Sequence, residues 1–86
     1  MRLLNFRYEG QPPGSVMIDR GTPLGNPFCR GTRKQNIARY KELFEQDKDM
    51  QAYLLSLGDV DLVCHCVPLQ CHGQVLIDWL ADRALA

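Results

Sequence analysis

The chain has 86 residues, of which 45% are hydrophobic, 8% aromatic and 23% charged, and its ten basic and ten acidic side chains cancel to a formal net charge of zero. This composition excludes a globally disordered chain, and the length predicts one compact domain over residues 1–86, because two cores would each be too small to fold unaided. No apolar run approaches the ~20 residues of a membrane span and residues 1–7 are too short and polar for a signal-peptide core, so we expect a cytoplasmic protein with no membrane contact and reduced cysteines.

The N-terminal third is predicted to form two strands and a long loop. Residues 3–8 alternate so that Leu4, Phe6 and Tyr8 share one face of a strand. A Gly- and Pro-rich turn follows over residues 9–14, and residues 15–18 form a second short strand. Residues 19–31 contain three glycines and two prolines, which excludes regular structure and predicts a shaped loop.

The rest of the chain is predicted to form three helices and one strand. Thr32 and Gln35 have the spacing of a capping box, which starts a helix over residues 33–46. A shorter helix over residues 50–57 ends at Gly58, a strand over residues 60–64 is expected to be central, and a last helix covers residues 72–84. The order β-β-α-α-β-α predicts an α/β fold, in which helices pack on a small sheet of about three or more strands.

The first motif, Arg20-Gly-Thr-Pro-Leu-Gly-Asn-Pro-Phe28, directly follows the second predicted strand. Gly21 and Gly25 allow a ligand to approach the backbone, and the prolines stiffen the loop. The Arg20 guanidinium suits a carboxylate or phosphate, and the Asn26 amide can both donate and accept hydrogen bonds. We interpret Arg20 and Asn26 as ligand-binding residues, and Phe28 as a core side chain that could alternatively stack on a ring.

The second motif, Cys64-His-Cys-Val-Pro-Leu-Gln-Cys-His-Gly73, lies between the central strand and the last helix. Cys64 and Cys66 face the same way if the segment is extended. Cys71 and His72 stand where the last helix begins, and the free N–H groups there favour anions, including a thiolate. Gly73 removes a side chain beside the site.

Three interpretations of this cluster stay open from the residues alone. Cys64, Cys66, Cys71 and His72 could bind zinc in a Cys₃His arrangement, with Cys29 or His65 as substitutes for one ligand. Alternatively, Cys71 is a nucleophile with a lowered pKa, and His72 or His65 is its base. In the third interpretation the cysteines are small buried side chains and His72 only caps the helix.

Charge is unevenly distributed along the sequence. Residues 1–41 carry eight basic and two acidic side chains, a net +6, and residues 42–86 carry two basic and eight acidic ones, a net −6. If the basic side chains converge they form an anion-attracting face, and otherwise the two halves neutralise one another at a solvated surface. Nucleic acid is a less favoured partner, because the basic half has no interleaved aromatic residues and no recognised DNA-binding pattern.

At these two motifs the sequence resembles a small, uncharacterised domain family of phages and bacteria. That family is marked by an R-G-x-P-x-G-N-P-F segment and a later C-x-C-x-P-x-x-C-H-G-x-x-L segment, and the resemblance runs from about Ile18 to Leu80. The second motif also resembles an uncharacterised bacterial family with P-x-x-C-H-R, whose arginine suggests an anion site. Here Gly73 replaces that arginine, so Arg20 or another basic residue would have to bind the anion. The resemblance implies a phage or bacterial origin and a pocket shared by both motifs, without naming a reaction.

We therefore predict a site for a small anionic ligand of the phosphate or nucleotide type, formed by the two motifs at the carboxyl ends of the sheet. Arg20 and the start of the last helix would hold the anionic group, Asn26 would contact a sugar or base edge, and Cys71 and His72 would lie nearest to any chemistry. The alternative is a zinc-stabilised phage accessory module that binds a host protein in the host cytoplasm. Whether the site catalyses a reaction stays open.

Overall fold

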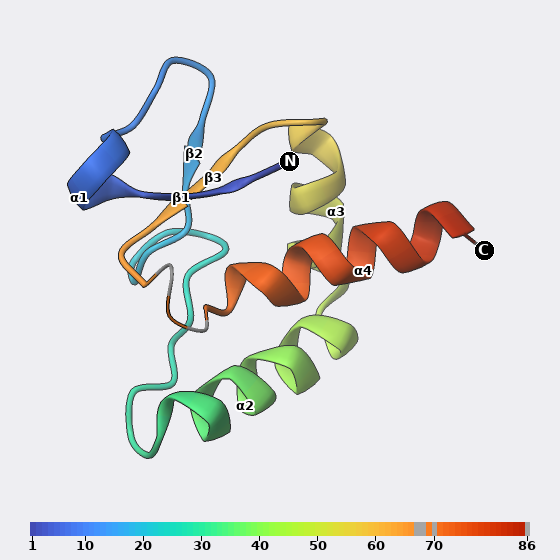
Figure 1. Ribbon diagram of the computed structural model, residues 1–86. Helices are drawn as coiled ribbons and strands as arrows, with labels where there is room; N and C mark the ends of the chain where they lie inside the picture. Colours follow the sequence, from blue (N-terminus) through green and yellow to red (C-terminus); the bar gives the residue numbers. More distant parts are fainter. Residues whose placement is uncertain (67–68, 70, 86) are drawn as a thin grey trace.

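The computed structural model describes residues 1–66, 69 and 71–85 and has the expected α/β architecture. Figure 1 shows a small sheet with helices packed against it. The elements in chain order are β1 (Leu3–Asn5), α1 (Phe6–Glu9), β2 (Val16–Met17), α2 (Arg33–Gln46), α3 (Lys48–Leu57), β3 (Leu62–Cys64) and α4 (Gly73–Leu85). The fold class is therefore confirmed, with one short helix, α1, that the sequence pattern did not predict.

The three strands form a parallel sheet in the order β1-β3-β2. Leu62 is paired with Leu3 on one side and with Val16 on the other. All three residues of β3 are buried, as expected for a strand with a neighbour on each side and helices nearby. The prediction that this strand is central is confirmed.

The first strand is shorter than predicted, because Asn5 ends it and caps α1. The Asn5 side-chain oxygen accepts a hydrogen bond from the Arg7 N–H at 2.8 Å, which turns the chain into a single helical turn. Phe6 and Tyr8 are consequently 45% and 74% exposed. The prediction that they share a buried strand face with Leu4 was wrong.

The helix α2 has the predicted bounds and the predicted capping box, in which the side chains of Thr32 and Gln35 each accept from the other's backbone N–H. Tyr40 and Phe44 on its inner face are fully buried. Asp47 ends α2 and also caps α3, accepting from the Asp49 and Met50 N–H groups at 3.0 Å. The two helices, which the sequence predicts as separate, are thus divided by one residue, Asp47, which serves as the cap of both.

Helices α2 and α4 lie side by side on one side of the sheet (Figure 1). Their inner faces meet through rings: Phe44 of α2 and Trp79 of α4 are perpendicular, with centroids 5.2 Å apart. Leu76 of α4 is fully buried, while Asp78 and Asp82 face solvent. None of the helices in residues 1–66 and 71–85 is long and apolar enough to cross a membrane.

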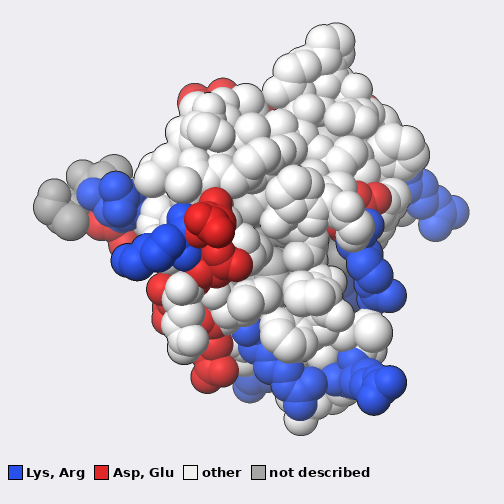
Figure 2. Space-filling view, turned by 180° about the vertical axis from the view of Figure 1, so that it is seen from behind, with Lys and Arg blue, Asp and Glu red and all other residues white. Residues whose placement is uncertain are grey.

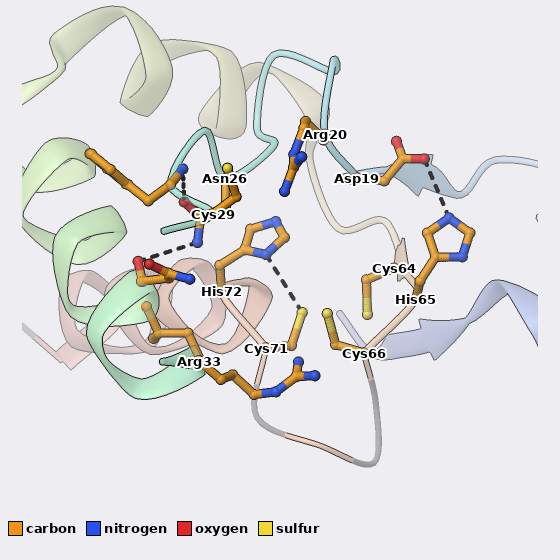
Figure 3. Close-up of a pocket in the computed structure, with 13 residues that line it drawn as sticks. Asp19, Arg20, Asn26, Cys29, Arg33, Cys64, His65, Cys66, Cys71 and His72 are labelled. Atoms are coloured by element: carbon orange, nitrogen blue, oxygen red, sulfur yellow. Dashed lines mark hydrogen bonds and ion pairs between the residues drawn. The ribbon is translucent and has the colours of Figure 1, made fainter. Parts of the chain in front are cut away.

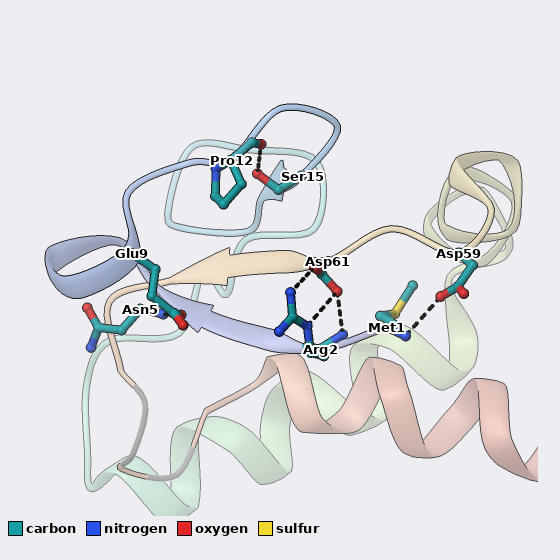
Figure 4. A network of polar contacts seen from close by, with 8 residues as sticks. All are labelled: Met1, Arg2, Asn5, Glu9, Pro12, Ser15, Asp59 and Asp61. Carbon is teal, nitrogen blue, oxygen red and sulfur yellow. Dashed lines mark hydrogen bonds and ion pairs between the residues drawn. The ribbon is translucent and has the colours of Figure 1, made fainter.

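Ion pairs at one end of the sheet fasten β1 to the segment that precedes β3 (Figure 4). The amino group of Met1 lies 2.8 Å from an Asp59 oxygen, and the Arg2 guanidinium lies 2.9 Å from an Asp61 oxygen. Hydrogen bonds from Arg2 hold the pKa of the Asp61 carboxyl below its usual range. These contacts lie at the amino ends of the strands. The two motifs lie at the opposite end of the sheet, where the carboxyl ends of the strands are.

Candidate functional site

The two motifs meet at the carboxyl ends of β2 and β3 and enclose a pocket of about 410 Å³. This volume is in the range of small-molecule sites. All four cysteines and both histidines of the chain line the pocket, together with Arg20, Asn26 and Arg33 (Figure 3). The predicted convergence of the two motifs is therefore present. Residues 67, 68 and 70 of the second motif lie outside the described residues.

Three of the cysteines form a compact sulfur cluster. Cys64 is the last residue of β3, Cys66 follows two residues later, and Cys71 stands two residues before α4, so the end of one strand and the loop after it contribute all three thiols. The sulfur atoms of the three all lie within 4.8 Å of one another, and Cys64 and Cys71 are buried. A tetrahedral zinc ion with bonds of ~2.3 Å spaces its sulfur ligands by roughly 3.8 Å. The cluster could therefore hold a metal ion with little movement.

Burial dominates the acid–base behaviour of Cys71. It raises the pKa of the Cys71 thiol well above its usual range, and the neighbouring Cys64 and Cys66 raise it further. The Gly73 N–H donates to the Cys71 sulfur at 3.3 Å and opposes this shift, but its effect is smaller. That Cys71 is a nucleophile stays a prediction, and the favourable helix N-terminus on which it rested is outweighed by burial.

His72 is buried beside the cluster and held in one orientation. Its Nε2–H donates to the Ile18 carbonyl oxygen at 2.7 Å, because a carbonyl oxygen can only accept. The other ring nitrogen, Nδ1, then carries a lone pair and lies 3.8 Å from the Cys71 sulfur. Burial lowers the pKa of His72, so the ring is neutral at pH 7. Of the four predicted metal ligands, His72 is the one whose ring nitrogens lie outside the 4.8 Å cluster.

The two residues predicted as substitute ligands lie on the outer part of the pocket. His65 is exposed and lies 3.4 Å from an Asp19 carboxylate oxygen, and its ring lies 5.5 Å from that of Phe6. Cys29 is exposed on the opposite loop. The buried sulfur cluster is thus surrounded by more polar, solvent-exposed side chains.

Two arginines reach the pocket from opposite sides, Arg20 from the first motif and Arg33 from the first turn of α2 (Figure 3). Within the described part of the chain, no carboxylate forms an ion pair with Arg20. Figure 2 shows Lys and Arg side chains along the lower edge and the right side of one face, and Asp and Glu side chains mostly on its left, where further Lys or Arg side chains lie beside them. The separation of charge on this face is therefore partial.

Asn26 uses both ends of its side-chain amide inside the chain. Its Nδ2 donates to the Asn36 carbonyl oxygen at 3.2 Å, and its Oδ1 accepts from the Phe28 N–H at 2.9 Å. These bonds fix the first motif against α2. Phe28 is partly buried, packs against the core and also lines the pocket, and its stacking on a ligand ring stays a prediction.

Two of the three predicted glycines, Gly25 and Gly73, allow close packing, and the third, Gly21, allows an unusual backbone conformation. A side chain on Gly25 would overlap the Asp19 carbonyl, and one on Gly73 would overlap Leu3 and come within 2.7 Å of Ile18. Gly21 has a φ of +92°, a conformation that favours glycine. Gly21 and Gly25 line a second pocket of about 310 Å³ on the other side of the loop, and Gly73 is buried beneath the sulfur cluster. Their contact with a ligand stays a prediction.

Helix α2 contributes a wall of the pocket that the sequence pattern did not predict. Arg33, Asn36 and Ile37 all line the pocket, and their spacing of three and four residues places them on one face of the helix. The capping box gave their register, but nothing in the sequence indicated that this face would turn towards the second motif.

Comparison with known proteins identifies one match. A family model described as a domain of unknown function (DUF4326) matches residues 4–82. No curated protein and no solved structure matches the chain. The resemblance to a small uncharacterised domain family is thereby confirmed over nearly the whole chain, and phage origin stays a prediction.

Proposed function

The chain belongs to this domain-of-unknown-function family, and from its site we propose that it binds a small phosphate-type anion of the nucleotide class beside a zinc ion held by Cys64, Cys66 and Cys71. One observation carries the proposal: every cysteine and histidine of the chain converges on one pocket that also receives two arginines. Side chains of these types rarely gather in one place without a ligand to share.

The donor set favours zinc. Three thiolates are soft ligands, which select zinc over magnesium or calcium, and tetrahedral zinc tolerates three protein ligands with a fourth position left to water or substrate. We expect that fourth position to face the pocket, because the sulfur cluster forms part of the pocket wall. Once bound, zinc would keep the thiols deprotonated and act as a Lewis acid towards a coordinated group.

The arginines would supply the attraction for an anion. Three thiolates outweigh the charge of a divalent ion, so the metal centre alone repels a phosphate. Arg20 and Arg33 approach from two sides, and guanidinium groups match phosphate oxygens with paired hydrogen bonds. Asp19 is the acid that lines the same pocket, and its carboxylate is engaged by His65.

A zinc ion in this cluster would also stabilise the fold, which is the role expected in the alternative of a zinc-stabilised module. Cys64 and Cys66 lie at the end of the central strand and Cys71 at the start of α4, so one ion would tie these elements together. A chain of 86 residues has a thin core, and a metal staple adds folding free energy directly. A host-protein partner stays a prediction.

Elemental analysis of the purified, reduced protein tests the metal. We expect about one zinc per chain, and we expect Cys64→Ser, Cys66→Ser and Cys71→Ser each to lose it. Cys29→Ser is the matched control, because Cys29 lines the pocket but lies outside the sulfur cluster. Folded protein that stays metal-free after incubation with zinc, or equal loss in the control, contradicts the proposal.

Calorimetric titration with adenosine 5′-monophosphate and with ribose 5-phosphate tests the anion. Because a hydrogen bond to a charged group contributes about 1.5–3 kcal/mol, Arg20→Ala and Arg33→Ala should each weaken binding by roughly 10- to 100-fold. Lys48→Ala removes the same charge at the start of α3, which does not line the pocket, and should leave the affinity unchanged. Absence of binding by both probes would refute this part of the proposal.

A further inference from the structure

One polar atom of a residue that lines the pocket has no hydrogen-bond partner among the described residues. The side-chain oxygen of Asn36 is shielded from solvent and accepts no hydrogen bond from residues 1–66, 69 and 71–85. The nitrogen of the same amide donates to the Gly31 carbonyl oxygen at 3.4 Å, so the amide is anchored at one end only. A buried acceptor without a donor costs free energy, and the great majority of such groups in folded proteins are paired.

The surroundings of Asn36 indicate what kind of group could pair with it. Asn36 lines the pocket between Arg33 and Ile37 on the same helical face, and Phe28 of the first motif lines the pocket too. One wall therefore offers a cation, an amide oxygen and an apolar side chain within a single helical turn, and an aromatic ring is close by. A flat ring that carries a hydrogen-bond donor fits the amide and the apolar groups together.

The neighbouring amide cannot take this role as it stands. Both ends of the Asn26 side chain are engaged by backbone groups, including the backbone carbonyl of Asn36 itself. These bonds hold the first motif against α2 and so fix the position of Asn36 relative to the pocket. The terminal torsion of an asparagine side chain is soft, so the Asn36 amide can turn out of its long 3.4 Å hydrogen bond with Gly31 and present the shielded Oδ1 to a bound ring.

We propose that the ligand of this pocket carries a heterocyclic base whose N–H group donates to the Asn36 oxygen, in addition to the phosphate that Arg20 and Arg33 hold. This inference rests on the proposed function and names its ligand class as a nucleoside monophosphate, as distinct from a sugar phosphate or inorganic phosphate. The pocket volume of about 410 Å³ accommodates a ligand of this size.

The test compares the four common ribonucleoside 5′-monophosphates with ribose 5-phosphate, which has the same phosphate and sugar but no base. With the zinc-loaded wild-type protein, we expect the tightest nucleotide to bind at least ~10-fold more tightly than ribose 5-phosphate, because a site built around a hydrogen bond rejects a molecule that lacks it. The variant Asn36→Leu keeps the side-chain size and removes the amide. This variant should bind the nucleotide about as weakly as it binds ribose 5-phosphate, and its affinity for ribose 5-phosphate should equal that of the wild-type protein.

Gln46→Leu, the same kind of exchange at an exposed position at the far end of α2, is the matched control and should keep the wild-type ratio. Folding of Asn36→Leu can be checked separately by its unfolding midpoint. The midpoint should change little, because the exchange removes an unpaired buried acceptor and loses only the long 3.4 Å hydrogen bond to the carbonyl of the exposed Gly31. If ribose 5-phosphate binds as tightly as every nucleotide, or if Asn36→Leu keeps the preference, this inference is overturned and the anion site survives. If no probe binds, the proposed function falls as well.

Discussion

Exchange of Tyr40 for phenylalanine tests how the loop over residues 19–31 is held in place. Tyr40 is fully buried in α2, and its hydroxyl donates to the Leu24 carbonyl oxygen at 2.8 Å, in the middle of the loop. Burial raises the pKa of the Tyr40 hydroxyl, so it stays protonated and able to donate. The variant Tyr40→Phe removes this donor with almost no change in volume, and it deprives the buried Leu24 carbonyl oxygen of the Tyr40 hydrogen bond.

The expected loss of stability is about 1–3 kcal/mol, the cost of a buried polar group without its hydrogen bond. For a domain of this size each kcal/mol corresponds to about 4–8 °C in melting temperature. Urea unfolding followed by circular dichroism should show a lower midpoint with an unchanged slope, since the surface exposed on unfolding stays the same.

The matched control is Tyr53→Phe in α3, where the ring is 36% exposed and the hydroxyl makes no hydrogen bond within the described residues. It should change the midpoint little. If Tyr40→Phe is as stable as this control, the loop is not held by the Tyr40 hydroxyl and the reasoning fails.

Three further predictions concern the loop, the helix junction and the metal. Gly25→Ala should destabilise the protein by about 1–3 kcal/mol or more, because the added methyl overlaps the backbone of Asp19, and urea unfolding would expose an error by showing wild-type stability. Asp47→Ala should cost about 0.5–2 kcal/mol and lower helicity, whereas Asp49→Ala, which keeps the cap, should cost less. Zinc added to the reduced protein should release protons into a weakly buffered solution and raise the melting temperature, and a chelator should reverse the rise in melting temperature; no proton release on zinc addition would count against thiolate ligation.

Much of the fold was predictable because its signals are local. The capping box at Thr32 and the apolar stripe through Tyr40 and Phe44 gave α2 its bounds, and the run of apolar residues before Cys64 indicated a central strand. The N-terminal strand was overestimated for an equally local reason. Alternation continued through Phe6 and Tyr8, but the side chain of Asn5 caps a helical turn, and this competing interaction decided the structure.

The candidate site was predictable in outline, because two unusual loops follow parallel strands that end at the same edge of the sheet. Its details depend on contacts between distant segments. The burial that raises the pKa of Cys71, the use of the Asn26 amide within the chain and the turn of Asn36 into the pocket all arise from packing of α2 against both motifs. No pattern along the sequence specifies that packing.

The strand order β1-β3-β2 has a consequence for the route by which the chain folds. Strands β1 and β2 do not pair with each other. Leu3 and Val16 each pair with Leu62 of β3, so neither strand can form its ladder before this distant part of the chain is in place. The entropy of closing these long loops has to be overcome before any ladder forms, which slows folding compared with a hairpin. Arrival of β3 also carries Cys64 and Cys66 to the pocket, so the sheet and the thiol cluster should assemble in one late, cooperative step.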